Sequence, residues 1–254
     1  MVKGNFVSAV ERAAIQNKSR IVLALDIKGS DALNRAERIL RDVSSYVCCV
    51  KLNKHLILPF GLQRVKAIVE LSHELGLPII ADCKLCDIGS TNEVEAELYF
   101  EAGFDAITVM PLPGWAEGLE GVFHLAKERG KGILAVVYMS HRGASEFFDV
   151  IMYDDELMIF DKLYRVFLRR SLRWHADGFI VGATKPDIIA QLKKEAANRP
   201  IFSPGVIAQG GSIVDALRAG ASYIIVGRAI CESSSPIDKA KELRNLIATS
   251  MQYL

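Results

Sequence analysis

Short apolar runs alternate with longer amphipathic stretches along almost the whole chain of 254 residues. The apolar runs predict strands at 20–26, 46–52, 77–82, 105–110, 132–139, 177–182, 200–204 and 222–227. The stretches between and after them predict helices at 31–42, 60–75, 91–102, 115–129, 155–173, 186–197, 211–219 and 236–250. Strands that alternate with helices form a parallel sheet. Eight such units predict an α/β fold, the closed (β/α)8 TIM barrel.

The alternative architecture is a doubly wound open sheet. It is less favoured because no Gly-x-Gly-x-x-Gly follows the first predicted strand. No linker rich in Pro or Ser interrupts the pattern, and a barrel of this length is one domain. We therefore expect residues 1–254 to form a single domain, with residues 1–19 as an N-terminal helical extension that covers one end.

Composition excludes several classes of protein. The formal net charge is +1, which argues against a nucleic-acid-binding protein. No apolar run reaches the roughly 18 residues that a membrane-spanning helix needs, and the N-terminus has no secretory apolar segment. Five cysteines are an odd number, which suits a reducing compartment. We expect a cytoplasmic protein that binds neither nucleic acid nor membrane.

The most informative motif lies at the end of the third predicted strand. Asp82 and Lys84 are two residues apart, so they project from the same face of a strand, and Asp87 follows where the strand ends. Carboxylates beside an ammonium group favour its charged form. Cys83 and Cys86 form a Cys-x-x-Cys, but neither a second pair nor histidines at ligand spacing accompany it. The motif predicts a fixed proton donor among negative charges; alone, it also fits a surface ion network.

Other strand ends carry polar residues as well. Asp26 ends the first strand, Lys51 the second, Ser140 follows the fifth and Arg228 the eighth. Active sites of (β/α)8 barrels lie at the carboxyl ends of the strands. We therefore expect these side chains to meet on one rim.

The loops after the seventh and eighth strands predict a phosphate site. Residues 203–212 read Ser-Pro-Gly-Val-Ile-Ala-Gln-Gly-Gly-Ser, and Gly227-Arg228 ends the eighth strand. Barrels often bind phosphate with these two loops, since glycines let backbone N–H groups approach an anion and arginine adds a charge-assisted contact. Glycines also serve tight turns, which is the structural alternative.

These residues together resemble the orotidine 5'-phosphate decarboxylases, in the short archaeal-type form. The family pattern Asp-x-Lys-x-x-Asp-Ile-x-x-Thr matches residues 82–91, and the resemblance covers about residues 20 to 245. Further agreement lies in Leu25-Asp26, Val50-Lys51, Met139-Ser140-His141, Pro204-Gly205-Val206, Gln209-Gly210-Gly211 and Val226-Gly227-Arg228. Arg142 departs from the proline that relatives often have there. The segment 147–174 is unusually rich in large apolar and aromatic residues, which suits a cover over the barrel or a contact with a partner.

The resemblance implies decarboxylation of orotidine 5'-phosphate to uridine 5'-phosphate in de novo pyrimidine biosynthesis, with neither metal nor cofactor. It implies a homodimer in which Asp87 and Thr91 act in trans. The catalytic residues that it implies are Lys84 as proton donor, Asp82, Asp87 and Lys51. The substrate-binding residues that it implies are Asp26, Lys51, Ile88, Thr91, Ser140, Pro204, Gly205, Val206, Gln209, Gly227 and Arg228.

Two other functions remain as alternatives. One is a magnesium-dependent decarboxylase or aldolase, such as the related 3-keto-gulonate-phosphate decarboxylases and hexulose-phosphate synthases. Those relatives have a glutamate at the end of the second strand, where this chain has Lys51. The other is a protein that only binds a nucleotide, against which the intact set of Asp82, Lys84 and Asp87 argues.

Overall fold

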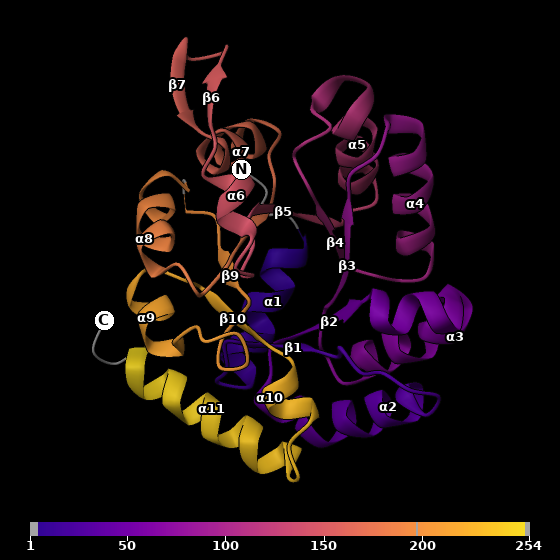
Figure 1. Cartoon of the computed structure of the whole chain (residues 1–254). Helices are drawn as coiled ribbons and strands as arrows, with labels where there is room; N and C mark the ends of the chain where they lie inside the picture. Colours follow the sequence, from indigo (N-terminus) through magenta and orange to yellow (C-terminus); the bar gives the residue numbers. More distant parts are fainter. Residues whose placement is uncertain (1–4, 197, 252–254) are drawn as a thin grey trace.

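Eight parallel strands close into a barrel in the computed structural model, which describes residues 5–196 and 198–251. Around the barrel the strand order is β1-β10-β9-β8-β5-β4-β3-β2, as Figure 1 shows. The strands are β1 (Ile21–Ala24), β2 (Cys49–Asn53), β3 (Ile79–Leu85), β4 (Ala106–Val109), β5 (Gly132–Tyr138), β8 (Gly178–Val181), β9 (Ile201–Ser203) and β10 (Tyr223–Val226). The predicted TIM barrel and all eight of its predicted strands are confirmed.

Helices pack around the outside of the barrel (Figure 1). The long ones are α2 (Ala32–Val43), α3 (Lys54–Glu74), α4 (Gly89–Glu101), α5 (Glu120–Glu128), α7 (Leu163–Arg173), α8 (Pro186–Glu195), α9 (Ile213–Arg218) and α11 (Pro236–Met251). Short ones are η1 (Ser44–Tyr46), η2 (Trp115–Leu119), α6 (Ala144–Phe148) and α10 (Arg228–Cys231). Residue 197, the last of the predicted helix 186–197, lies outside the described residues. No described helix is long and apolar enough to cross a membrane.

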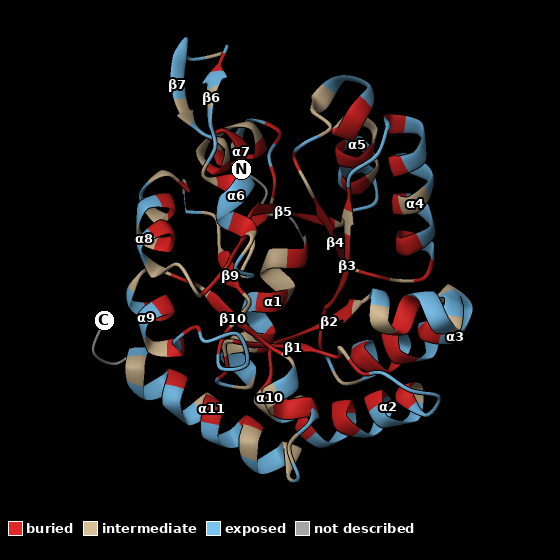
Figure 2. Cartoon of the chain, in the orientation of Figure 1, coloured by how far each residue is buried: buried red, intermediate tan, exposed pale blue. Residues whose placement is uncertain are grey.

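Burial explains why the strands and helices could be predicted from the sequence pattern. All seven residues of β5 are buried, because a parallel strand in a barrel has side chains on one face and helices on the other. In α2 the buried residues are Ala32, Ala36, Ile39, Leu40 and Val43, the spacing of a helix with one apolar face. Figure 2 shows buried strands inside and helices that are exposed on their outer faces.

Helix α1 (Asn5–Gln16) lies across the amino-terminal end of the barrel. The ring of Phe6 stacks on Phe202 of β9, with centroids 6.4 Å apart. A Cβ on Gly132, the first residue of β5, would lie 2.7 Å from the Phe6 ring, so this glycine lets α1 approach the barrel. Residues 1–4 of the predicted extension 1–19 lie outside the described residues.

The predicted helix 155–173 is wrong in its first half. Residues 155–158 form a turn, and an antiparallel hairpin joins β6 (Ile151–Asp154) to β7 (Ile159–Lys162) before α7 begins. Burial alternates along β6, with Asp154 buried on the side of α7, whereas Ile151 and, across the hairpin, Phe160 are exposed on the other side. Two ion pairs of 2.8 Å join Arg169 of α7 to Asp154 and Asp161. The hairpin projects away from the barrel (Figure 1).

Two other helices begin at different residues than predicted, and two short helices were not predicted. Helix α3 begins six residues before residue 60, at Lys54, and Gly61 interrupts it with a φ of 72°. The predicted helix 115–129 is α-helical only over Glu120–Glu128, after the irregular turn η2. The short helices α6 and α10 were not predicted, because four or five residues are too few to show a helical period.

Candidate active site

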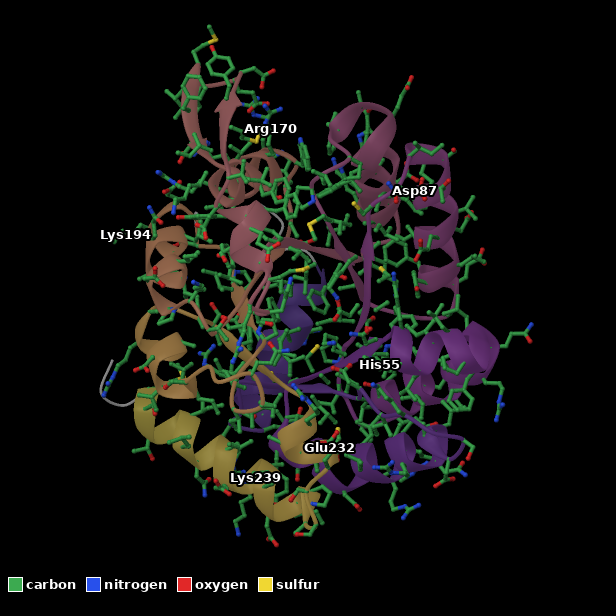
Figure 3. All side chains as sticks on the ribbon, in the orientation of Figure 1. His55, Asp87, Arg170, Lys194, Glu232 and Lys239 are labelled. Carbon is green, nitrogen blue, oxygen red and sulfur yellow. The ribbon has the colours of Figure 1, made fainter. Side chains whose placement is uncertain are left out.

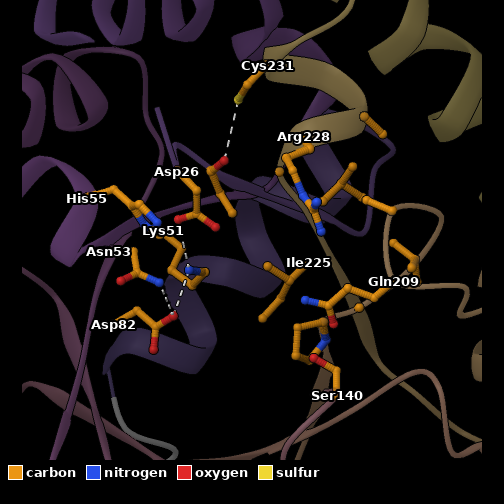
Figure 4. A pocket seen from close by; sticks show the side chains of 18 of the residues that line it. Asp26, Lys51, Asn53, His55, Asp82, Ser140, Gln209, Ile225, Arg228 and Cys231 are labelled. Atoms are coloured by element: carbon orange, nitrogen blue, oxygen red, sulfur yellow. Dashed lines mark hydrogen bonds and ion pairs between the residues drawn. The ribbon is translucent and has the colours of Figure 1, made fainter. Parts of the chain in front are cut away.

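A cavity of about 710 Å³ opens at the carboxyl ends of the barrel strands. It brings together residues from β1, β2, β3, β5, β8 and β10 and from the loops that follow β1, β5, β9 and β10. The predicted site residues that line it are Asp26, Lys51, Asp82, Lys84, Ser140, Pro204, Gly205, Val206, Gln209, Gly227 and Arg228. In Figure 4 Asp26, Lys51 and Asp82 lie on one side, with Ser140, Gln209 and Arg228 across from them.

A buried ion network forms one wall of the cavity. The Lys51 Nζ donates to Asp82 Oδ2 at 2.7 Å and lies 3.5 Å from Asp26 Oδ1. The Lys84 Nζ donates to the other oxygen of Asp82, Oδ1, at 2.5 Å. Lys51 is 4% exposed and Asp82 9%, whereas a third of the Lys84 side chain is exposed. Both lysines line the cavity, and of the two ammonium groups that of Lys84 is the more open to a bound molecule.

Within this network, charge pairing shifts the pKa values more than burial does. Burial alone would raise the pKa of Asp82, but the ammonium groups of Lys51 and Lys84 outweigh it, and the pKa of Asp82 lies well below its ordinary value. Burial alone would lower the pKa of Lys51, but the carboxylates of Asp82 and Asp26 outweigh it, and the pKa of Lys51 is raised. Both groups are charged at neutral pH.

Three residues that the sequence analysis did not assign contact this network or lie beside it. Asn53 donates from Nδ2 to Asp82 Oδ2 at 3.4 Å, and Thr108 of β4 donates to Asp82 Oδ1 at 3.1 Å. His55 lines the cavity, and its Nδ1 is buried without a hydrogen-bond partner among the described residues. Asn53 could have been found, because it lies two residues after Lys51 and shares its strand face. Thr108 is the one polar residue in the otherwise apolar β4.

The opposite wall combines a glycine-rich loop with an arginine. Gly205 has a φ of +92°, and a Cβ there would lie 2.5 Å from Cβ of Ser140 and 2.8 Å from the Gln209 side chain. Only glycine fits this close approach. Ile207 also has a positive φ, 58°, so the loop is held in a strained form. Arg228 begins α10 with an exposed side chain at the edge of the cavity. This wall suits an anion.

Asp87, Ile88 and Thr91 lie apart from the cavity. All three are exposed, and Figure 3 shows Asp87 beside α4, at a distance from His55. The Asp87 N–H donates to Asn92 Oδ1 at 3.0 Å, and Asp87 Oδ1 accepts the Ile88 N–H at 2.7 Å. The single chain therefore does not bring the second acid of the motif to Lys84.

No three His, Cys, Asp or Glu side chains gather into a set that could hold a metal ion within residues 5–196 and 198–251. Cys83 is buried and Cys86 exposed, and both are free thiols. Burial raises the pKa of the Cys83 thiol to about 12, so Cys83 is protonated and a poor nucleophile at neutral pH.

The ion network makes a testable contribution to stability. A carboxyl group whose pKa is depressed on folding stabilises the protein above its unfolded pKa, about 3.9, and loses that effect as the pH falls through its folded pKa. We expect Asp82→Asn to lower the free energy of unfolding by about 3 kcal/mol at pH 7. The difference from the wild type should shrink below about pH 4.

Urea unfolding between pH 3 and pH 7 measures this difference. The exposed Glu101→Gln is the control, and its effect should stay within about 0.5 kcal/mol of zero. A difference for Asp82→Asn that stays constant over the whole range would show that the carboxylate charge does not stabilise the fold.

Comparison with known proteins gives a consistent result. The family model described as orotidine 5'-phosphate decarboxylase / HUMPS family matches residues 19–243. The orotidine 5'-phosphate decarboxylase of Methanosarcina barkeri is 35% identical over 230 residues, which cover 90% of this chain and 95% of that protein. That of Thermococcus kodakarensis is 37% identical over 227 residues, 89% of this chain and 95% of that protein.

A solved structure is similar over the same range. The orotidine 5'-monophosphate decarboxylase of Methanocaldococcus jannaschii, complexed with the inhibitor BMP, matches with a TM-score of 0.77 and 30% identity. The match covers 90% of this chain and 98% of that one. The family model matches most of the chain, two relatives are more than 30% identical to it, and the solved structure has a similar fold. The chain therefore belongs to the orotidine 5'-phosphate decarboxylase / HUMPS family.

Proposed function

We propose that the chain decarboxylates orotidine 5'-phosphate to uridine 5'-phosphate, a step of pyrimidine biosynthesis. The observation that carries the proposal is the pair of Lys84 and Asp82 at the open side of a buried network, across a cavity from an anion site. Relatives that share 35–37% of the sequence are named for this reaction. Five free cysteines suit the reducing cytoplasm, where we place the protein.

The two walls of the cavity suit the two ends of the nucleotide. We assign the phosphate to Arg228, Gln209 and Gly227, with the loop 205–211 closing over it. Pro204, Gly205 and Val206 shape the floor of that subsite. We assign the ribose hydroxyls to Asp26 and Lys51 on the opposite wall, and the pyrimidine edge to Ser140. The Lys51 Nζ lies 3.5 Å from Asp26 Oδ1, so the ion pair holds the Asp26 carboxylate at this wall.

The chemistry requires stabilisation of charge at C6 of the pyrimidine. Breaking the bond from C6 to the carboxylate leaves an electron pair in the ring plane, and carbon dioxide departs. The Lys84 ammonium stabilises this charge electrostatically and then donates its proton to C6. Asp82 holds Lys84 in place and crowds the substrate carboxylate. Binding of the distant phosphate contributes energy that is realised in the transition state.

A second subunit completes the site in this proposal. Ile88, at the N-cap of α4, and Val94 and Leu98 within α4 are 64%, 60% and 48% exposed. Val94 and Leu98 share one face of α4 with Thr91, because helix residues three or four apart are neighbours. Such an apolar face suits a two-fold interface. Asp87, Ile88 and Thr91 do not line the cavity of their own chain. Across the interface, they would enter the cavity of the partner.

Lys51 opposes the magnesium-dependent alternative. Its ammonium group lies between Asp26 and Asp82, so a cation already neutralises the carboxylates that a metal would need. Loss of absorbance of orotidine 5'-phosphate, followed with and without EDTA, separates the two functions. We expect the same rate in both conditions; a rate that collapses in EDTA and returns with Mg²⁺ would favour the alternative.

Lys84→Ala tests the proton donor. We expect turnover to fall by at least about 10³-fold, since general acid–base groups contribute roughly 10²–10⁴ and charge stabilisation is lost as well. Binding of uridine 5'-phosphate, measured by calorimetry, should persist because the phosphate and ribose contacts remain. Lys54→Ala removes an exposed lysine nearby and should be near wild type. Near-normal turnover by Lys84→Ala would eliminate Lys84 as the donor.

Arg228→Ala tests the phosphate site. We expect kcat/KM for orotidine 5'-phosphate to fall about 100-fold, while kcat/KM for the nucleoside that lacks the phosphate changes less than about threefold. The exposed Lys194→Ala on α8 removes a cation away from the cavity and serves as the control. Equal fractional losses on both substrates would show that Arg228 acts on the structure rather than on the phosphate.

Mixing inactive variants tests subunit sharing. Lys84→Ala chains and Asp87→Ala chains, allowed to exchange, form hybrid dimers with one doubly altered site and one intact site. At equal mixing, half the dimers are hybrids, and we expect roughly a quarter of the wild-type activity. Lys84→Ala mixed with Asp82→Ala is the control and should stay inactive, because both residues lie in one chain's wall. If mass spectrometry confirms that the chains have exchanged and activity still does not return, Asp87 acts in the site of its own subunit.

A further inference from the structure

Thr108 is a buried residue of β4 whose hydroxyl joins two parts of the ion network. It is 0% exposed and does not line the cavity. Its Oγ1 accepts the backbone N–H of Lys84 at 2.9 Å and lies 3.1 Å from Asp82 Oδ1. The Lys84 N–H can only donate, so the hydroxyl proton is free to point to the carboxylate. One hydroxyl thus holds both the backbone of Lys84 and the side chain that Lys84 pairs with.

The backbone of Lys84 needs such a partner because β3 bulges there. Ala81 pairs with Ile107 and Leu85 with Val109, so three residues of β3 lie opposite the single residue Thr108. Lys84 has a φ of +53°, the left-handed region that residues other than glycine seldom adopt. A bulge re-aims a side chain and interrupts the ladder of backbone hydrogen bonds. The Thr108 hydroxyl accepts a hydrogen bond from the Lys84 N–H, which the interrupted ladder leaves without a backbone acceptor.

The Asp82 carboxylate is held in one orientation by the same contact. Its Oδ2 accepts from Lys51 and Asn53, and its Oδ1 accepts from Lys84 and Thr108. Without the hydroxyl, the partly exposed Lys84 side chain would be the only donor to Oδ1 among these four. The carboxylate could then rotate, and the ammonium group would follow it away from a bound substrate.

We propose that Thr108 is a positioning residue for decarboxylation: its hydroxyl fixes the bulge that carries Lys84 and the carboxylate that orients the lysine. The proposal rests on the proposed function, since Lys84 is the reacting group there. Thr108 acts through Lys84 and Asp82, and it contributes nothing to the phosphate wall across the cavity.

Thr108→Val and Thr108→Ser separate the hydroxyl from the packing. Valine keeps the shape and loses the hydroxyl; serine keeps the hydroxyl and loses a methyl group. We expect kcat of Thr108→Val to fall roughly 10- to 100-fold, because small misplacements of a reacting group have effects of that size. KM and the affinity for uridine 5'-phosphate should change less than about threefold, since the phosphate contacts are intact. Thr108→Ser should stay within about threefold of wild type in kcat.

Ser72→Ala is the matched control for loss of a buried hydroxyl. Ser72 in α3 is 0% exposed and donates to the Leu77 carbonyl at 2.9 Å, before β3 begins and at the other end of the barrel. We expect it to lower the midpoint of thermal unfolding as Thr108→Val does, with wild-type kcat. All rates are measured well below the unfolding temperature of each variant, so that loss of folded protein does not count as loss of kcat.

Crystal structures of the wild type and Thr108→Val add a measure that is independent of turnover. In Thr108→Val we expect Lys84 to leave its positive φ or its Nζ to leave Asp82. A wild-type kcat in Thr108→Val, a Thr108→Ser as slow as Thr108→Val, or an unmoved Lys84 would each overturn the proposal. If the wild type itself does not decarboxylate orotidine 5'-phosphate, the proposed function fails, and the crystal structures still decide whether Thr108 positions Lys84.

Discussion

The pairing of one buried carboxylate with two ammonium groups is the interaction on which the site depends. Asp82 accepts from Lys51 on one oxygen and from Lys84 on the other. Taking such charges out of water costs several kcal/mol for each ion, and only good geometry with further hydrogen bonds offsets that cost. Thr108 and Asn53 supply those further bonds. The network is therefore stable only as a set, which fixes the direction of Lys84.

The barrel determines where this set can form. The strand ends β1, β2 and β3 are adjacent in the sheet, so Lys51 of β2 and Asp82 of β3 meet directly, and Asp26, two residues after β1 ends, lies beside them. The opposite wall is built from loops, and Gly205 and Ile207 have positive φ there. Rigid strands hold the charged groups, and a strained loop forms the anion site. Strain of this kind is typical of functional sites.

The hairpin of β6 and β7 shows where local reasoning failed. Residues 155–173 contain enough apolar side chains to suggest one helix, but Asp154 and Asp161 both pair with Arg169. These three residues are up to fifteen positions apart, so no window of helical length reveals that they meet. Their ion pairs fold the first half of the segment back as a hairpin, and its apolar outer face remains exposed.

The sequence alone determined the barrel, because buried parallel strands and amphipathic helices leave a periodic pattern that needs no knowledge of distant contacts. It also identified Asp82 and Lys84 together, since two residues on one strand face are neighbours in any fold that keeps the strand. Only the tertiary structure decided that Thr108 completes the network and that Asp87 lies apart from Lys84 within the chain. Those facts depend on a bulge opposite β4 and on the direction in which the chain leaves β3. Neither follows from a local pattern: the bulge is set by the pairing of β3 with β4, and Asn92, which accepts the Asp87 N–H, is itself held by the Gly118 carbonyl.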